Sequence, residues 1–438
     1  MYWFYSLLLF LALIVSTPWW LLEMWRHGKY RSGWSERLGA VPQRLLGHNG
    51  EETIWVHAVS VGEVLAAAPV IEALRAQLPG WRIVVSTTTD TGQRLARQRF
   101  GEDNVLYLPL DLPFSVRPYF AALRPRMLVL AESEFWPNLL RCARLSGAAV
   151  AVVNARVSDR SLPGYLRFRR LLRRVMQNVD LFLAQSDEDA RRLIRIGASP
   201  ERVSVSGNLK FDVSPPVKSH IVAELADARR RESIHPVIVA GSTLEGEESL
   251  LLAMFRQVAA RYSGALLVLA PRHPERFAAV AALLASSTLG FTRRSEWNGE
   301  QAIAGRVLLL DSMGELAALY ELADLAFIGG SLVPRGGHNV IEAAQFGVPI
   351  LVGRSTENFR DIVDMFRRAG ALRVVDTATL APAVLQLLAD TDQRQAIGRR
   401  ALEVMRSQQG ATGKTVGELL RLLRLPVPAA EVPSESRR

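Results

Sequence analysis

Residues 327–350 read FIGGSLVPRGGHNVIEAAQFGVPI, and this stretch decides the fold class. Its pattern predicts a buried strand, a glycine-rich loop, a short helix, a turn and a second strand. Glycines let backbone N–H groups approach a phosphate, and a helix N-terminus adds favourable partial charge. Glu342, one turn into that helix, is placed to accept hydrogen bonds from ribose hydroxyls. The alternative is a structural βα turn with a solvated glutamate. The stretch contains no GxxxxGK[ST] phosphate loop.

Outward from this stretch, apolar strand signals alternate with helical ones along most of the chain. The helical signals include residues 62–78 and 91–100. The strand signals fall at residues 53–58, 82–87, 127–130, 148–153, 181–184, 237–240, 265–269, 307–310, 325–328 and 349–352. Such alternation predicts right-handed βαβ units and parallel sheets, with ligands beyond the carboxyl ends of the strands. We therefore expect an α/β protein of two doubly wound, Rossmann-like domains facing across a cleft.

The proline pair in the sequence VSPPV (residues 213–217) interrupts this rhythm and predicts a linker. We expect an N-terminal acceptor-binding domain over residues 23–212, a linker over 213–218 and a C-terminal nucleotide-donor domain over 219–425. The remaining tail, residues 426–438, is rich in Pro, Ser and charge and is predicted to be disordered.

The first 22 residues, MYWFYSLLLFLALIVSTPWWLL, contain no charged side chain. A helix of this length can cross a hydrocarbon core of about 30 Å, and aromatic residues lie at both ends. Basic residues follow from Arg26 onward, which predicts an inner-membrane signal-anchor with the catalytic domains in the cytoplasm. A cleaved signal peptide is disfavoured because no basic residue precedes the run. A shallow helix lying in the membrane interface stays open, since Pro18 interrupts the run.

The cysteine count and the net charge of the chain exclude some kinds of site and favour an anionic partner. The chain has 438 residues, a formal net charge of +10 and one cysteine, Cys142. One cysteine excludes an intramolecular disulfide and a cysteine-based zinc site. The positive charge suits an anionic partner, and arginines concentrate in residues 26–37 and 156–174. No basic stripe interleaved with aromatic residues is present, so we expect no nucleic-acid binding.

Carboxylates follow two predicted strands of the N-terminal half. Glu63 ends the sequence AVSVGE (58–63), where it can act as a general base on a hydroxyl. The alternative for Glu63 is a helix-start glutamate favoured by the helix dipole. Glu132 and Glu134 lie in LAESEFWPN (130–138). Closely spaced acids can bind a metal, but no DxD pair or histidine cluster completes a site, so no metal and no cofactor are predicted.

Further polar residues follow strands of the C-terminal half or lie near the linker. Arg272 in APRHPER (270–276) can pair with a phosphate. Pro271 and Met313 can flank a nucleotide base, Met313 lying in DSMGE (311–315). Lys210 in GNLKFD (207–212) is placed to meet negative charge on a donor.

These strings, with HAVSVGE (57–63) and GGHN (336–339), resemble in content and order the 3-deoxy-D-manno-octulosonic acid (Kdo) transferases of lipopolysaccharide biosynthesis. The resemblance extends to about Leu423. It implies a GT-B fold and an inverting, metal-independent glycosyltransferase that moves Kdo from CMP-Kdo to a lipid A precursor, lipid IVA, at the inner membrane. It gives Glu63 the role of base and makes Glu132 and Lys210 stabilisers of the transition state. The CMP-binding residues that it implies are Pro271, Arg272, Met313, Gly314, Glu315, Asn339, Val340, Ile341 and Glu342.

Two other functions remain as alternatives. Another GT-B enzyme acting on a nucleotide sugar, such as an epimerase or a transferase with a different lipid-linked acceptor, fits the same motifs. An epimerase needs neither a membrane segment nor a basic acceptor surface. A purely scaffolding membrane protein has no use for glycine loops and carboxylates placed after so many strands.

Overall fold

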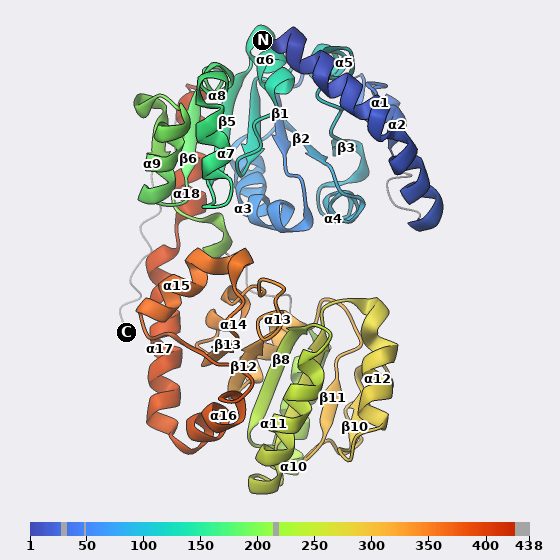
Figure 1. The fold of residues 1–438 in the computed structure, drawn as a ribbon, viewed down its shortest axis with the longest axis vertical. Helices are drawn as coiled ribbons and strands as arrows, with labels where there is room; N and C mark the ends of the chain where they lie inside the picture. Colours follow the sequence, from blue (N-terminus) through green and yellow to red (C-terminus); the bar gives the residue numbers. More distant parts are fainter. Residues whose placement is uncertain (28–32, 48–49, 213–218, 425–438) are drawn as a thin grey trace. The chain divides into compact units, whose positions relative to one another are not determined.

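The computed structural model describes residues 1–27, 33–47, 50–212 and 219–424, with the backbone alone for residues 18–27. The chain folds into two compact units (Figure 1). The first comprises Met1–Val213 together with Gln408–Arg438, and the second comprises Ser214–Ser407. The predicted linker (213–218) and disordered tail (426–438) lie outside the described residues.

The described part of the first unit contains a parallel sheet of seven strands in the order β3-β2-β1-β4-β5-β6-β7. Its strands are β1 (Thr53–His57), β2 (Arg82–Thr87), β3 (Val105–Tyr107), β4 (Met127–Ala131), β5 (Ala149–Ala155), β6 (Leu181–Ala184) and β7 (Val203–Val205). Its helices are α1 (Tyr2–His27), α2 (Trp34–Arg37), α3 (Val61–Gln77), α4 (Asp90–Phe100), α5 (Pro113–Leu123), α6 (Pro137–Leu145), α7 (Leu162–Arg167), α8 (Arg169–Met176), α9 (Asp187–Ile196) and α18 (Ala411–Leu422).

Strand β1 shows why this sheet is covered on both faces. All five of its residues are buried. Trp55 belongs to the apolar core on one face, where it packs against Tyr119 and Phe120. Ile54 and Val56 point into the core on the other face, with α3 and α18. A parallel strand buried on both faces reads as a continuous apolar run, and this is the pattern that predicted β1.

The second unit repeats the design. Over its described residues the sheet is again parallel, in the order β10-β11-β9-β8-β12-β13-β14. Its strands are β8 (Val237–Thr243), β9 (Leu266–Pro271), β10 (Phe291–Arg293), β11 (Val307–Leu309), β12 (Leu325–Ile328), β13 (Ile350–Val352) and β14 (Leu372–Val374). Its helices are α10 (His220–Glu232), α11 (Glu247–Arg261), α12 (Phe277–Ala285), α13 (Leu316–Leu319), α14 (Ile341–Ala344), α15 (Arg360–Arg368), α16 (Leu380–Ala389) and α17 (Thr391–Gln408).

The four strands that the sequence did not predict are β3, β7, β10 and β14. Each has three residues, and each lies at an edge of its sheet. A three-residue strand with one neighbour carries too short an apolar run to stand out from a loop.

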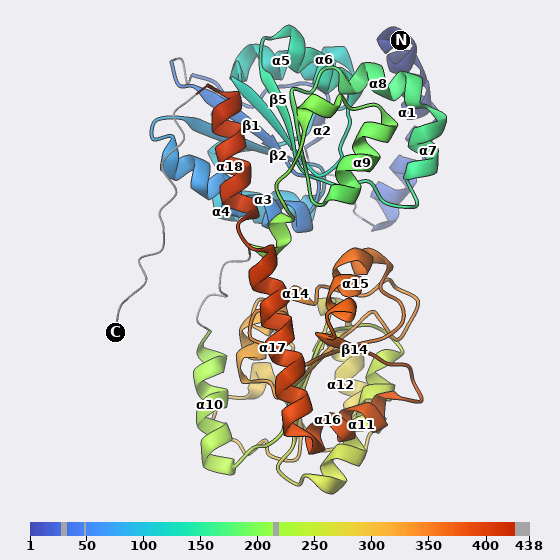
Figure 2. The ribbon, with the colours of Figure 1, turned by 90° about the vertical axis from the view of Figure 1, so that its left-hand side faces the viewer.

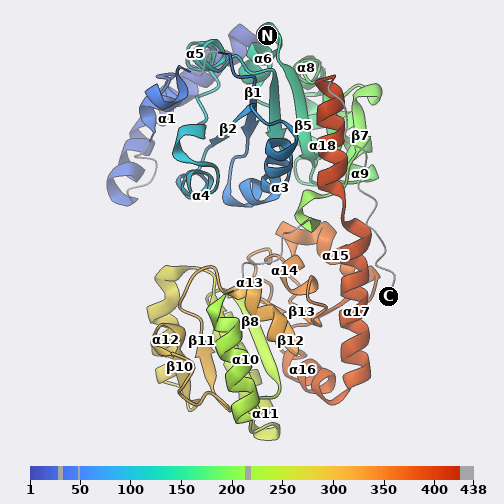
Figure 3. The ribbon, with the colours of Figure 1, turned by 180° about the vertical axis from the view of Figure 1, so that it is seen from behind.

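Helix α18 changes the division of the chain into domains. The sequence assigned residues 219–425 to the second domain, whereas residues from Gln408 onward belong to the first unit. Figures 2 and 3 show α18 beside α3. Val416, Leu419 and Leu420 are buried there in the core that contains Ile54 and Val56. Helix α18 is amphipathic in sequence. Only the tertiary packing shows which of the two cores its apolar face covers.

The predicted membrane anchor over residues 1–22 is not supported. No helix among the described residues is both long enough and apolar enough to span a bilayer. Helix α1 does form, and its first turns make polar contacts with the first unit. The Asn138 amide donates to the Ser6 hydroxyl at 3.0 Å, and the Asn178 amide donates to the Tyr2 hydroxyl at 2.8 Å. Sequence hydropathy does not register such contacts, because their partners lie more than 130 positions away.

Candidate functional site

Two carboxylates of the first unit follow neighbouring strands. Glu63 comes after β1 and Glu132 directly after β4, and these two strands pair in register from Ile54–Met127 to His57–Leu130. Between β1 and β4 the strand order reverses direction, which is where ligands bind in open parallel sheets. The sheet therefore brings together two of the three predicted catalytic residues.

The Glu63 side chain closes the first turn of α3. Its Oε2 accepts a hydrogen bond from the Val59 N–H at 2.6 Å, and its Oε1 accepts one from the Ser60 hydroxyl at 3.0 Å. These contacts are the ones expected of a glutamate that stabilises the start of a helix, the alternative role for Glu63. Burial nevertheless raises the pKa of Glu63 to about 7, helped by the negative charges of Glu132 and Glu134 and opposed by the two hydrogen bonds. A carboxylate with such a pKa is suited to accept a proton near neutral pH.

Glu132 is paired with Lys210. The Lys210 ammonium donates to Glu132 Oε1 at 3.1 Å, and both side chains remain about a quarter exposed (27% and 29%). Glu132 has a left-handed backbone, with φ 60°, and its N–H donates to the Val153 carbonyl of β5 at 2.9 Å. Left-handed geometry is uncommon for a non-glycine residue and often accompanies function. Burial and the charge of Glu132 raise the pKa of the neighbouring Glu134.

Asn154 is a residue that sequence reasoning missed. It is the penultimate residue of β5, is 1% exposed and also has a left-handed backbone, with φ 54°. Its Oδ1 accepts from the Leu209 N–H at 3.0 Å, one residue before Lys210. In the sequence it directly follows the apolar run 148–153, the same signal that singled out Glu132. Asn154 thus holds the short 3₁₀ turn Leu209–Phe211 that carries Lys210.

In the second unit, the residues predicted to bind CMP follow β9, β11 and β12. Pro271 ends β9, and the Arg272 N–H donates to the Thr243 carbonyl at 3.0 Å. Met313 lies in the loop after β11 with 62% of its surface exposed, and Gly314 has φ 88°. The Glu315 carboxylate pairs with Arg294 at 3.3 Å.

The remaining predicted residues, Asn339–Glu342, divide into two kinds. Val340 and Ile341 are fully buried, so their side chains pack in the core. Asn339 donates from its amide to Glu342 Oε1 at 3.4 Å and accepts from the Ile341 N–H at 3.1 Å. Burial raises the pKa of Glu342, and Asn339 and the charge of Arg272 oppose this. Arg272 and Glu342 thus lie within electrostatic reach of each other although they follow different strands.

His338 lies beside these groups. Burial, together with the positive charges of Arg272 and His273, lowers the pKa of His338 to about 4. Its Nε2 is buried, without a hydrogen-bond partner in the described part of the chain. A Cβ at Gly330 would lie 2.9 Å from the His338 ring, so the ring packs directly on that glycine. His338 is therefore a neutral imidazole at pH 7.

Three N–H groups of the glycine-rich loop after β12 are engaged by one carboxylate of the same unit. The N–H groups of Gly330, Ser331 and Leu332 all donate to the carboxylate of Glu247, a residue that sequence reasoning did not select. Helix α14 has only four residues, so its dipole is small. These three N–H groups are therefore not available to a phosphate in this structure.

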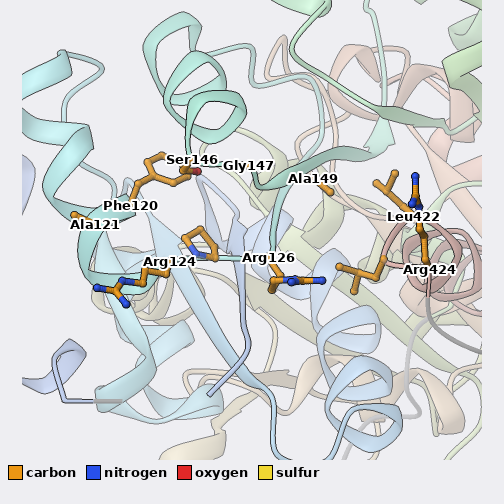
Figure 4. Close-up of a pocket in the computed structure, with 11 residues that line it drawn as sticks. Phe120, Ala121, Arg124, Arg126, Ser146, Gly147, Ala149, Leu422 and Arg424 are labelled. Carbon is orange, nitrogen blue, oxygen red and sulfur yellow. The ribbon is translucent and has the colours of Figure 1, made fainter. Parts of the chain in front are cut away.

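The described residues also form a pocket whose lining includes neither Glu63 nor Glu132. A pocket of about 730 Å³ lies at the opposite, amino end of the first sheet, beside Arg126 at the start of β4 and the end of α18. Figure 4 shows the Arg124 and Arg126 side chains of this pocket extending away from each other. Within the described ranges, no group of three His, Cys, Asp or Glu side chains could hold a metal ion.

Comparison with known proteins assigns the family. A sequence model described as 3-deoxy-D-manno-octulosonic-acid transferase matches residues 32–213. The 3-deoxy-D-manno-octulosonic acid transferase of Haemophilus influenzae is 37% identical over 385 residues, covering 86% of this chain and 87% of the relative. The enzyme of the same name from Bordetella pertussis is 37% identical over 427 residues, covering 93% and 97%.

The fold is shared more widely. The Staphylococcus aureus MnaA–UDP structure superposes with a TM-score of 0.56 at 16% identity, covering 86% of this chain and 98% of that one. This likeness confirms the expected GT-B-type fold of two parallel-sheet domains. On the two curated relatives, the chain belongs to the 3-deoxy-D-manno-octulosonic acid transferase family of glycosyltransferases.

Proposed function

We propose that this transferase moves Kdo from CMP-Kdo to lipid IVA by a single, inverting displacement that needs no metal. The observation that carries the proposal is Glu63, whose pKa is raised to about 7 at the carboxyl edge of the first sheet, near Glu132. Donor and acceptor are expectations from the sequence resemblance, and the CMP group is assigned to the second unit.

In the proposed step, the Glu63 carboxylate takes the proton of an acceptor hydroxyl. The hydroxyl oxygen forms a bond to the anomeric carbon of Kdo as the bond from that carbon to the CMP phosphate oxygen breaks. The electron pair of the broken bond stays on CMP. One displacement from the opposite side inverts the anomeric configuration. The leaving phosphate needs its negative charge stabilised and does not need a proton.

The Lys210–Glu132 pair supports charge stabilisation in this step. Lys210 supplies a positive charge, and Glu132 holds its ammonium at 3.1 Å. A preorganised charge in a partly desolvated position stabilises a transition state more than the same charge in water. Glu132 also raises the proton affinity of Glu63 through its negative charge. The pair thereby acts on both the leaving group and the base.

On the donor side, Arg272 supplies a guanidinium suited to a phosphate. Glu342 can accept from ribose hydroxyls, and its amide partner Asn339 orients it. Met313, with 62% of its surface exposed, can pack against the base. His338, a neutral imidazole, can donate or accept a hydrogen bond beside Arg272.

For the acceptor lipid we propose a groove of about 750 Å³ between α1 and the starts of α5 and α6. Trp3, Leu7, Phe10 and Phe114 supply apolar lining for acyl chains. Arg117 and Arg141 line the same groove and can meet the phosphates. Asn138, at the start of α6, lines the groove six residues after Glu132, which supports this assignment.

We further propose that α1 lies along the membrane surface, the shallow arrangement left open by the sequence. Its exposed apolar residues Phe4, Leu8, Leu11 and Val15 are spaced three or four apart and form one stripe. The opposite side of the helix contacts the protein through Tyr2 and Ser6. A helix of this kind can lie at the boundary of headgroups and acyl chains.

The decisive experiment incubates the purified full-length protein with CMP-Kdo and lipid IVA dispersed in detergent. Mass spectrometry then counts added Kdo residues, and NMR reads the anomeric configuration of the product. Glu63→Gln is the matched control, since it keeps the size of the side chain. We expect Kdo-bearing lipid with inverted configuration and a loss of at least about a hundredfold in the control. Retained configuration, or an unreactive lipid IVA with another acceptor consumed, would overturn the proposal.

A further inference from the structure

Glu247 occupies the place in the glycine-rich loop where an anion would otherwise bind. It is the first residue of α11 and is fully buried. Each of its carboxylate oxygens accepts two backbone N–H groups. Oε2 accepts from Leu244 and Gly330 at 2.9 and 2.6 Å, and Oε1 accepts from Ser331 and Leu332 at 3.0 and 2.9 Å. Four acceptor positions on one carboxylate are thereby filled.

Successive N–H groups converging on one point are the usual form of a backbone anion site. Here the anion is a side chain of the same chain. The loop after β8, which carries Leu244, is joined through Glu247 to the loop after β12, which carries Gly330–Leu332. Both loops lie at the carboxyl edge of the second sheet, where β8 and β12 are neighbours.

The loop held by Glu247 (residues 330–332) contacts the segment that leads to the residues assigned to CMP. The Gly337 N–H donates to the Gly330 carbonyl at 2.8 Å, and the His338 ring packs on Gly330. Asn339 and Glu342 follow within five residues of Gly337. A displacement of Gly330 would therefore move the start of α14.

We propose that Glu247 is a positioning residue for the donor site. It holds the glycine-rich loop in one shape before the donor arrives, in place of the phosphate that such a loop commonly binds. This inference rests on the proposed function, which assigns CMP to the second unit. It adds that the donor phosphate is not bound by the N–H groups of Gly330, Ser331 and Leu332, and that these groups stay bonded to Glu247 throughout the reaction.

Glu247→Gln tests the proposal, because the amide NH₂ cannot accept from two N–H groups and opposes them. Glu245→Gln is the matched control, since Glu245 is exposed in the same turn and loses the same charge. For Glu247→Gln we expect the Kd of CMP by calorimetry and the KM for CMP-Kdo to rise at least about tenfold. We expect kcat at saturating donor to stay within about threefold, because the base is in the first unit. The control should match the parent.

A folded Glu247→Gln variant with parental CMP affinity would overturn the proposal, as would a loss in kcat alone. Hydrogen exchange on the parent protein tests the same point if the variant does not fold. The amides of residues 330–332 should be protected without CMP and should change little when CMP saturates. If these amides exchange rapidly in the free protein and become protected only with CMP, Glu247 does not hold the loop before the donor binds. If the parent binds no CMP, the donor assignment fails, while protection in the free protein still reports on Glu247.

Discussion

The Lys210 ammonium lies 3.1 Å from the Glu132 carboxylate, although 78 positions separate the two residues in the chain. Strands β4 and β7, which they follow, are separated in the sheet by β5 and β6. Asn154, at the end of the intervening β5, holds the turn that brings Lys210 across. The pair is thus built by the sheet and not by local sequence.

Lys210→Met should reduce Kdo transfer by at least about a hundredfold and leave the fold intact. Removing a preorganised charge that stabilises the leaving group lowers the rate by about a hundredfold or more. A partly exposed ion pair, in contrast, contributes at most about 1 kcal/mol to the free energy of unfolding. Steady-state kinetics and a thermal melt measure both effects. Arg144→Met removes one partner of another exposed pair, Arg144–Asp180, and should leave turnover unchanged. A Lys210→Met enzyme within a few-fold of the parent would exclude Lys210 from the step.

The rate should follow the ionisation of Glu63. A base acts when deprotonated, so kcat should rise about tenfold per pH unit below pH 7 and level off above it, since its pKa is raised to about 7. Glu63→Gln should flatten this limb and lower the plateau by at least about a hundredfold. A parental pH profile in the Gln variant would assign the limb to another group, and Glu134, with its own raised pKa, would be the next candidate.

The same raised pKa links Glu63 to stability with a definite sign. The folded protein binds the proton more tightly than the unfolded chain, so the contribution of Glu63 is fully present at low pH. It is lost as the pH rises through about 7. The difference in unfolding free energy between Glu63→Gln and the parent, followed by denaturant titration, should therefore shift in favour of the variant from pH 5 to pH 8. A pH-independent difference would contradict the raised pKa.

Glu342→Ala should weaken CMP binding by roughly ten- to a hundredfold, since a hydrogen bond to a charged group is worth about 1.5–3 kcal/mol. Calorimetry with CMP measures the change. Glu321→Ala, at an exposed position of the same unit, is the control for loss of charge. If CMP affinity is unchanged, the ribose contact belongs to another residue.

Chelation should not affect the rate. In the proposed step, Lys210 and the second-unit Arg272 supply the positive charge that a metal provides in other transferases. Turnover measured with excess EDTA should equal turnover with added magnesium. A rate that falls on chelation and returns with magnesium or manganese would refute the metal-independent step.

The apolar stripe of α1 should be needed for membrane binding and not for chemistry. Leu8→Asp with Leu11→Asp places two charges on exposed positions of the stripe. Sedimentation with vesicles containing anionic lipid should fall at least about tenfold, while turnover on detergent-dispersed acceptor stays near the parental rate. Val205→Asp, an exposed apolar position outside α1, is the control. Unchanged sedimentation would place the membrane contact on another surface.

The sequence by itself determined the α/β class, the two repeated sheets and the positions of Glu63 and Glu132. Buried parallel strands are apolar on both faces, so β1, β4, β8 and β12 appear as local runs, and Glu132 directly follows one of them, β4. These features depend on neighbours a few positions away, and such information is present in the sequence itself.

Tertiary structure alone decided what depends on partners distant in sequence. The edge strands have too few residues to be recognised, and α18 returns to the first unit because its buried face completes the core behind β1. Helix α1 has an apolar composition that predicts an anchor, whereas Asn138 and Asn178 hold it against the first unit. Glu247 looks like any helix-start glutamate until the loop after β12, 83 positions later, folds onto it. Hydropathy and local spacing describe single segments. Whether a buried polar group stabilises the protein depends on the hydrogen-bond donors that the fold brings to it.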